Sequence, residues 1–331
     1  MPEIRQNPAT KEWVIIATER AKRPEDFVSE EPKISDAPKH EKSCPFCPGN
    51  EEKTPPEIMR VPGTNGKWRV RVVPNKFAAL VPEGEVTREE DSNFFRSMDG
   101  VGKHEVVIET PDHDASFGQI SDTKAFEIVK VYHKRYTELL EDDRFKLVKI
   151  FRNHGKAAGT SLEHPHSQIV ATPIVPLHIR HRLEAATRYF DDHGQCVFCR
   201  MIDMEKKEKD RVVLETDRFI VIEPFAARVP FETWVLAKEH RATFGEVSVA
   251  ELKEFGKTVN TVIGKLRRGL QNPAYNLVVR TAPSGEEGEE YYHWHVQIIP
   301  RLTLSAGFEL GTGVFINTTF PEMTAQFLRK V

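Results

Sequence analysis

The chain has 331 residues, of which 39% are hydrophobic and 29% are charged, a composition typical of a soluble globular protein. No apolar run is long enough to cross a membrane, and the N-terminus lacks the apolar segment of a secretion signal, so we predict a cytoplasmic protein. The formal net charge of -3 excludes a general attraction to nucleic acid or to an anionic membrane. The length allows two domains, or one domain built from two halves.

The four cysteines form two pairs of the same pattern, Cys44-Pro-Phe-Cys47 and Cys196-Val-Phe-Cys199. A single Cys-x-x-Cys pair in such a chain suggests either metal binding or redox chemistry. Two near-copies far apart favour two structural zinc sites over a redox pair or disulfides.

The first half of the chain continues from Cys47 with strand-like apolar segments at 68–73 and 105–109, followed by His113. Apolar residues at helical spacing then run from Phe126 to Leu140, and a further strand is expected at 145–151. A glycine-containing loop leads to 164–168, which reads His-Pro-His-Ser-Gln.

The second half repeats this order after Cys199. Strands are expected at 211–214, 219–222 and 232–237, and His240 follows them. A capping box at Ser248 predicts the start of a helix, and 275–280 reads as another strand. The motif at 293–297 is His-Trp-His-Val-Gln, a second His-x-His-x-Gln triplet. An internal repeat in this order identifies the triplets as functional motifs.

Alternate residues of a strand share one face, so a strand at the first triplet would direct His164, His166 and Gln168 the same way. The alternative for one triplet alone is a polar strand face with solvated histidines. We place the boundary between the halves at residues 178 and 179, which gives domains 1–178 and 179–331. A short helix is expected at 321–330.

Motifs along nearly the whole chain resemble the galactose-1-phosphate uridylyltransferase family of the histidine-triad superfamily. They are Asn7-Pro8, Arg20-Ala-Lys-Arg23-Pro24, Cys44 to Asn50, Asn75-Lys-Phe-Ala-Ala79, Phe151-Arg-Asn153, Gly159, Ser161, the first triplet and Gly307-Phe-Glu309. The resemblance implies an α+β fold of two histidine-triad-like halves. Each half would be a mostly antiparallel half-barrel sheet with a packed helix.

The expected chemistry centres on the first triplet. A neutral imidazole attacks phosphorus well near pH 7, and the phosphoramidate that forms divides one transfer into two steps. The resemblance implies that His166 is this nucleophile and that His164 is a metal ligand. Gln168 can donate a neutral hydrogen bond to a phosphoryl oxygen but cannot supply a proton, which favours transfer over hydrolysis. We group Ser161 with His166 and Gln168 as catalytic residues.

Further residues are expected to bind substrate. The loop before the first triplet brings backbone N–H groups toward phosphate oxygens, and two arginines offer positive charge to a diphosphate. The predicted substrate-binding set is Arg20, Arg23, Asn75, Asn153, Gly159, Thr160, Glu309, Gly311 and Gly313. Solvated arginines and a loop-capping Asn153 are the structural alternatives.

The resemblance implies two structural zinc ions per chain, each with four protein ligands and no open position. The first set is Cys44, Cys47, His113 and His164. The second is Cys196, Cys199, His240 and a histidine of the second triplet, which spacing leaves open between His293 and His295; we favour His295. The remaining histidines, His104 among them, are interpreted as surface or packing residues.

We therefore predict a nucleotidyltransferase that acts on UDP-glucose and galactose 1-phosphate. Its partners would be a nucleotide sugar and a sugar 1-phosphate, with no nucleic acid or membrane partner. We also predict that the protein is a homodimer. Thr160 stands where many uridylyltransferases have cysteine, and the tail from Gly307 to Asn317 resembles nucleotide-sugar phosphorylases. An ADP-glucose phosphorylase is therefore the alternative. A zinc-knuckle protein that binds RNA or protein, and a nucleotide hydrolase, are the remaining ones.

Overall fold

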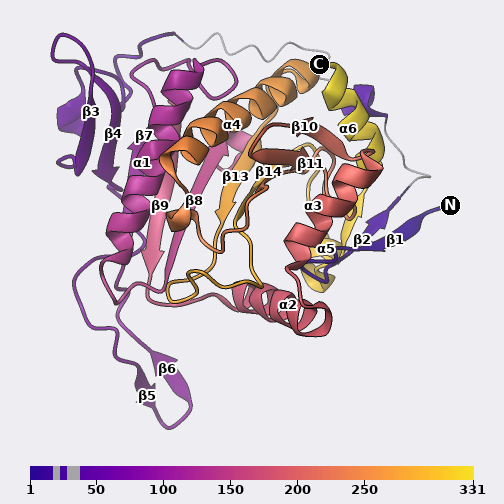
Figure 1. Ribbon diagram of the computed structural model, residues 1–331. Helices are drawn as coiled ribbons and strands as arrows, with labels where there is room; N and C mark the ends of the chain where they lie inside the picture. The colour runs from indigo at the N-terminus through magenta and orange to yellow at the C-terminus, as the bar shows by residue number, and fades with distance from the viewer. Residues whose placement is uncertain (18–22, 28–37) are drawn as a thin grey trace.

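The computed structural model describes residues 1–17, 23–27 and 38–331, and its fold is of the predicted α+β class (Figure 1). The largest unit is a ten-stranded sheet in the order β10-β11-β12-β14-β13-β8-β9-β7-β4-β3, in which every neighbouring pair is antiparallel. Its strands are β3 (Met59–Pro62), β4 (Trp68–Pro74), β7 (Lys103–Ile108), β8 (Leu147–His154), β9 (His166–Thr172), β10 (Val212–Glu215), β11 (Phe219–Ile222), β12 (Thr233–Ala237), β13 (Tyr275–Arg280) and β14 (His295–Pro300).

The two halves of the chain meet in the middle of this sheet. The first half supplies β3, β4, β7, β8 and β9, and the second supplies the other five strands. β8 pairs with β13, with Asn153 opposite Asn276. The boundary predicted at residues 178 and 179 falls in the first turn of α2 (Leu177–His193) and stays a prediction.

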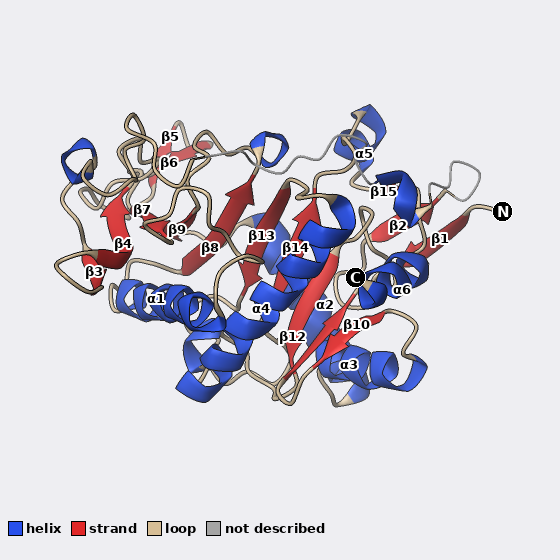
Figure 2. Ribbon diagram, turned by 90° about the horizontal axis from the view of Figure 1, so that it is seen from above, coloured by secondary structure: helices blue, strands red, loops and turns tan. Residues whose placement is uncertain are grey.

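One face of the sheet is covered by α1 (Asp122–Leu140) and α4 (Val249–Leu270), one helix from each half, which lie side by side (Figures 1 and 2). The helices approach closely at Gly256, where a Cβ would lie 2.9 Å from the backbone N of Phe126. The predicted capping box at Ser248 is present, and its hydroxyl accepts from the backbone N–H of Glu251. Burial of the apolar faces of both helices against the sheet forms the main core.

The opposite face carries the cysteine pairs. In the second half, α2 and α3 (Val197–Glu208) pack there around Trp234 and Tyr292. In the first half, Phe46 and the cysteines beside it pack against Trp68 and Ile108. The two faces thus separate the core formed by the long helices from the part of the molecule that contains both histidine triplets.

The remaining elements are peripheral. They are β1 (Glu3–Gln6), β2 (Trp13–Ile16), β5 (Glu89–Asp91), β6 (Phe95–Ser97), β15 (Phe315–Asn317), α5 (Gly307–Thr312), α6 (Pro321–Lys330) and the 3-10 turns η2 (Pro24–Phe27), η3 (Glu51–Lys53), η4 (Lys156–Ala158) and η5 (Phe244–Glu246). β1, β2 and β15 form a small sheet that joins the two ends of the chain. Within the described ranges, no helix is long and apolar enough to span a membrane.

The first triplet differs from its prediction in one respect. β9 begins at His166, so only His166 and Gln168 share a strand face, and His164 lies before the strand. His164 is completely buried beside Cys47 and His113 rather than aligned with His166. The two histidines therefore have separate environments.

Candidate active site and metal centres

His166 is held in one tautomer by the backbone. Its Nδ1 lies 2.8 Å from the carbonyl oxygen of His164, and a carbonyl can only accept, so Nδ1 carries the proton. The lone pair is therefore on Nε2. Burial lowers the pKa of His166, which keeps the ring neutral at neutral pH. Phe46 packs its ring 5.4 Å from the imidazole at a steep angle and fixes its orientation.

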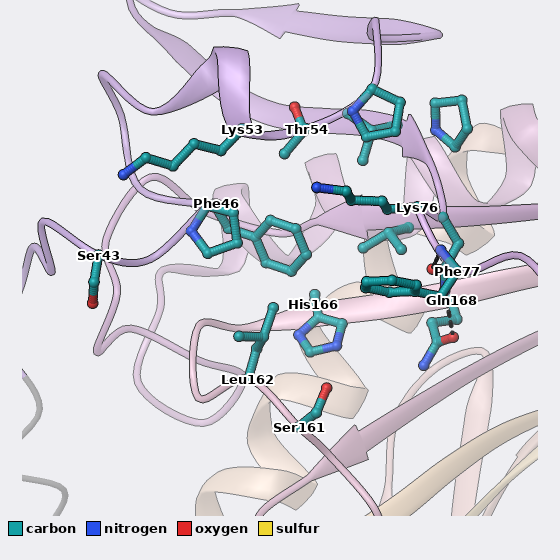
Figure 3. Close-up of a pocket in the computed structure, with 16 residues that line it drawn as sticks. Ser43, Phe46, Lys53, Thr54, Lys76, Phe77, Ser161, Leu162, His166 and Gln168 are labelled. Atoms are coloured by element: carbon teal, nitrogen blue, oxygen red, sulfur yellow. Dashed lines mark hydrogen bonds between the residues drawn. The ribbon is translucent and has the colours of Figure 1, made fainter.

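His166 lines a cavity of about 670 Å³, a volume within the range of ligand sites (Figure 3). Its walls are Ser43, Pro45, Phe46, Lys53, Thr54, Pro55, Val73, Pro74, Asn75, Lys76, Phe77, Val106, Ser161, Leu162, His166 and Gln168. Two lysines and no acidic side chain are found among these described residues. The cavity therefore suits an anionic ligand.

The cavity brings together several of the predicted residues. Gln168 is two positions beyond His166 on the same face of β9, Ser161 lies on the loop before the strand, and Asn75 follows β4. Gln168 and Asn75 are also in contact, because Asn75 Nδ2 donates to Gln168 Oε1 at 3.4 Å.

Three other predicted substrate-binding residues lie nearby but do not line the cavity. Asn153 Oδ1 accepts from Asn276 Nδ2 at 2.7 Å, so this side chain connects the two halves of the sheet. Thr160 donates its hydroxyl to the carbonyl of Leu162. Gly159 adopts a left-handed conformation with φ +88, which favours glycine.

The rest of the predicted substrate-binding set lies elsewhere. Glu309, Gly311 and Gly313 belong to α5 and its C-terminal cap, outside the cavity of their own chain. Arg23 is exposed and does not line the cavity, and Arg20 is outside the described residues.

The first predicted metal set forms one cluster. Ligand atoms of Cys44, Cys47, His113 and His164 all lie within 4.8 Å of one another. His164 Nδ1 is 3.3 Å from His113 Nδ1 and 3.6 Å from Cys47 Sγ, which matches the roughly 3.3–3.8 Å edges of a tetrahedron with zinc bond lengths. His164 Nε2 donates to the carbonyl of Thr110 at 2.8 Å, so Nδ1 presents its lone pair to the cluster. Burial lowers the pKa of His164 to about 4, which keeps the imidazole ring in its neutral form.

The second cluster corrects the preference for His295. It consists of Cys196, Cys199, His240 and His293. His293 Nδ1 is 3.4 Å from His240 Nδ1, and its Nε2 donates to the carbonyl of Ala237 at 2.9 Å. His293 therefore repeats the contacts of His164, the first histidine of the other triplet. None of the four cysteines forms a disulfide in the structure.

In the second triplet, His295 is enclosed by aromatic side chains rather than placed in a cavity wall. His295 is 1% exposed and stacks on Trp234 with 4.9 Å between ring centroids. Trp234 pairs with Gln297 across β12 and β14, whereas Val106 pairs with Gln168 across β7 and β9. A valine at this position leaves room for the cavity that it lines, and a tryptophan fills the equivalent space. Of the second histidines of the two triplets, His166 and His295, only His166 therefore lines a cavity.

Sequence reasoning did not assign several residues that line the cavity. Lys53 and Lys76 add positive charge, while Phe46 and Phe77 add aromatic surface (Figure 3). Three of them stand inside motifs that the resemblance already used: Phe46 between the first cysteines, and Lys76 and Phe77 directly after Asn75. Lys53 has no comparable signal.

A duplicated sheet with two clusters of potential metal ligands, and with one neutral histidine open to an anion-compatible cavity, suits an enzyme of the nucleotidyltransferase class. The comparisons with known proteins agree with this class. The family model described as galactose-1-phosphate uridyl transferase, N-terminal domain, matches residues 1–176, and that of the C-terminal domain matches residues 182–310. The chain belongs to the galactose-1-phosphate uridyl transferase family, and it is an enzyme of the nucleotidyltransferase type.

We describe two of the curated relatives that match over the whole chain. An ADP-glucose phosphorylase from Arabidopsis thaliana is 37% identical and is covered over 93% of its length. A galactose-1-phosphate uridylyltransferase from Thermotoga maritima is 31% identical and is covered over 98%. Among solved structures, the Arabidopsis ADP-glucose phosphorylase with bound ADP-glucose superposes with a TM-score of 0.84 at 34% identity, covering 100% of this chain and 99% of that one.

Proposed function

We propose that this protein transfers a nucleotidyl group from a nucleotide sugar through a covalent nucleotidyl-His166 intermediate. The observation that carries the proposal is the placement of a neutral imidazole, with its lone pair on Nε2, at the wall of a cavity that contains two lysines and no acid among its described residues. A related chain at 34% identity has been solved with a nucleotide sugar bound, which supports this ligand class.

In the first step, Nε2 of His166 attacks the α-phosphorus of the nucleotide sugar. An N–P bond forms, the bond from phosphorus to the bridging oxygen breaks, and the sugar 1-phosphate leaves with the electron pair of that bond. In the second step, a phosphate oxygen of the acceptor attacks the same phosphorus and His166 leaves as neutral imidazole. The carbonyl of His164 accepts a hydrogen bond from Nδ1–H of His166 throughout and stabilises the positive charge of the intermediate.

The residues around His166 have supporting roles in this scheme. Gln168 donates its amide to a phosphoryl oxygen, and Ser161 offers a hydroxyl beside the imidazole (Figure 3). Lys53 and Lys76 attract the diphosphate. Asn153, Gly159 and Thr160 shape the loop that leads to Ser161.

We further propose that each cluster holds one structural zinc ion. Two thiolates and two neutral imidazoles suit zinc, and four protein ligands leave no position for a reacting group. The ion would fix the ligands and stabilise the fold around them. Zinc-thiolate sites require reduced cysteines, which fits the predicted cytoplasmic location.

Two pairs of substrates fit this scheme. The order of motifs along the chain favours UDP-glucose with galactose 1-phosphate, and the Thermotoga relative supports that reaction. Identity of 37% to an ADP-glucose phosphorylase supports the alternative, in which inorganic phosphate accepts the adenylyl group and ADP is released. We favour the phosphorylase because that relative is the more similar of the two and the tail of the chain also resembles this group.

One experiment separates the two reactions. UDP-glucose and ADP-glucose are supplied in turn, each with galactose 1-phosphate or with phosphate, and kcat/KM is compared. The phosphorylase proposal predicts that ADP-glucose with phosphate exceeds UDP-glucose with galactose 1-phosphate by about 100-fold, which corresponds to about 2.7 kcal/mol in the transition state. A preference of that size for UDP-glucose with galactose 1-phosphate would instead establish the uridylyltransferase.

We also propose a homodimer. Leu304, Phe308 and Leu310, in and just before α5, are large apolar residues that are 92%, 48% and 78% exposed. An apolar group of this kind is suited to burial against a second copy. Sedimentation should give twice the chain mass of 37.9 kDa, and a monomer at micromolar concentration would exclude the proposal.

A further inference from the structure

His104 lies between Gln168 and the segment Asn75 to Ala79. It is on β7, opposite Val170 of β9, while the neighbouring pair is Val106 with Gln168. His104 and Gln168 are therefore diagonal neighbours on one face of the sheet, and His104 Nε2 lies 2.7 Å from Gln168 Oε1. At the other side of the ring, the backbone N–H of Ala79 points at His104 Nδ1 at 3.3 Å.

These two contacts determine the tautomer of His104. A backbone N–H can only donate, so Nδ1 of His104 must be the acceptor and carries no proton. Nε2 then carries the proton of the neutral ring and donates to Gln168 Oε1. The assignment follows from the neighbours of the ring alone.

Asn75 also donates a hydrogen bond to Oε1 of Gln168. Its Oδ1 accepts from the backbone N–H of Phe77 at 2.9 Å, so its Nδ2 is the end that faces Gln168 and donates to Gln168 Oε1 at 3.4 Å. His104 Nε2 and Asn75 Nδ2 are 3.1 Å apart because both donors converge on one oxygen.

The orientation of the Gln168 amide follows from these donors. An amide flipped by 180° would place its NH2 group against two donors, so Oε1 must face His104 and Asn75 and Nε2 must face away from them. No described residue accepts a hydrogen bond from Nε2 of Gln168, which lines the cavity beside His166. The oxygens of a phosphoryl group are acceptors only, so the orientation with NH2 toward the cavity is the one that can stabilise them.

We propose that His104 is a positioning residue that fixes the side-chain amide of Gln168 with its NH2 group toward the transferred phosphoryl group. This inference rests on the proposed nucleotidyl transfer through His166. It replaces the interpretation of His104 as a surface or packing residue. His104 also connects Gln168 to the segment Asn75 to Ala79, because its carbonyl accepts from the backbone N–H of Asn75 at 2.8 Å and its Nδ1 accepts from Ala79.

Two isosteric substitutions separate the two hydrogen bonds of the ring. In His104→Gln, the amide nitrogen can occupy the position of Nε2 and still donate to Gln168, while the acceptor for Ala79 is lost. In His104→Asn, the amide oxygen can occupy the position of Nδ1 and still accept from Ala79, while the donor to Gln168 is lost. The two variants are thus matched in polarity, and only His104→Gln keeps the hydrogen bond to Gln168.

The test measures the rate at which full-length protein forms nucleotidyl-His166 in a single turnover, at saturating ADP-glucose or UDP-glucose. We expect His104→Asn to be slower by about 10- to 100-fold, as when a donor to a developing oxyanion is lost, and His104→Gln to stay within about 3-fold of wild type. Gln168→Ala should show a loss similar to that of His104→Asn, and the double variant His104→Asn/Gln168→Ala should be no slower than Gln168→Ala alone.

A His104→Asn variant as fast as wild type, equal losses in both His104 variants, or losses that add in the double variant would each overturn the positioning role. If wild-type protein forms no covalent intermediate with either nucleotide sugar, the proposed function itself fails. That result is distinguishable, because it does not depend on any substitution at His104.

Discussion

The side chain of the first histidine in each triplet belongs to a cluster of potential metal ligands, and its backbone carbonyl accepts a hydrogen bond from the second histidine. His164 Nδ1 faces His113 and Cys47, while its carbonyl oxygen accepts the Nδ1 proton of His166 at 2.8 Å. The same bond joins His293 and His295 at 3.0 Å. One residue thus belongs to the cluster through its side chain and orients the neighbouring imidazole through its backbone.

The assignment of His293 to the second cluster predicts a difference between two matched variants. His293→Asn removes an imidazole whose Nδ1 faces the cluster, so we expect it to lose one metal ion per chain. His295→Asn should keep both ions, because the asparagine amide can still donate to the carbonyl of His293. Elemental analysis of zinc per chain distinguishes them, and retention of two ions in His293→Asn with loss in His295→Asn would restore the original preference.

The sequence predicted which residue types gather at each site but not which atom faces which neighbour. Spacing did not separate His293 from His295, because both are close enough in the chain to reach the cysteines. The internal repeat favours His293, because the first triplet also contributes its first histidine, His164, to its cluster. The role of His104 could not be predicted, because it depends on the register of β7 with β9.

At the scale of elements, the C-terminal helix α6 docks on the sheet through a buried carboxyl group. Glu223 follows β11 and is fully buried, and its Oε2 accepts a hydrogen bond from the hydroxyl of Thr324 in α6. Its other oxygen, Oε1, has no hydrogen-bond partner among the described residues. Burial raises the pKa of Glu223 well above its usual value of 4.5.

Glu223 is therefore expected to reduce stability as pH rises. Above about pH 4.5 the unfolded state releases this proton while the folded state retains it, so the free energy of unfolding falls with increasing pH, by about 1.4 kcal/mol for each unit of raised pKa. Glu223→Gln removes this penalty and preserves the acceptor for Thr324. Its Tm relative to wild type should be higher at pH 8 than at pH 5.

Glu322, on the same helix, serves as the control. Burial opposes its ionisation, but hydrogen bonds from Arg211 and Arg5 leave the pKa of Glu322 below its usual value. Ionised Glu322 stabilises the folded state at any pH above the pKa that this group has in the unfolded chain. This stabilisation is lost as the pH falls through the lower pKa that Glu322 has in the folded protein. Glu322→Gln should therefore lower Tm more at pH 8 than near pH 4, opposite in sign to Glu223→Gln. An unchanged difference between Glu223→Gln and wild type across pH would contradict a buried, proton-retaining Glu223.

Elements with strong local signals were predicted well. The capped start of α4, the strands at 219–222 and 275–280, and the helix at 321–330 all form as expected. α3, which begins inside the second Cys-x-x-Cys motif, was not predicted. The sheet of β1, β2 and β15 was missed because Phe315 pairs with Val14 across almost the whole chain, and local periodicity carries no information on such pairing.

At the scale of the whole molecule, the two halves share a sheet but differ in chemistry. The pairing of β8 with β13 makes the sheet continuous, and no sequence pattern indicated this junction. The repeat predicted two similar halves, and the clusters confirm that similarity. The difference between them lies in Val106 and Trp234, each opposite the glutamine of its triplet.

This asymmetry predicts different consequences of losing each metal. Cys44→Ser disturbs the cluster that contains His164, and through the His164 carbonyl it disturbs His166. We expect a lower Tm and a drop in turnover of at least about 10-fold. Cys196→Ser should lower Tm with little change in turnover below the melting transition, because His295 is enclosed by Trp234 and Phe198. Equal losses of turnover at matched folded fractions would argue against separate roles.

The most direct test of the account is the covalent intermediate itself. Wild-type protein is incubated with ADP-glucose or UDP-glucose labelled at the α-phosphorus, without acceptor, and is isolated under alkaline conditions in which phosphohistidine survives. The account predicts label on the peptide that contains His166, its release on addition of phosphate or a sugar 1-phosphate, and none on His166→Ala. Stoichiometric label on His166→Ala, or turnover by wild-type protein without any labelled enzyme or exchange of label between nucleotide sugar and sugar phosphate, would contradict it.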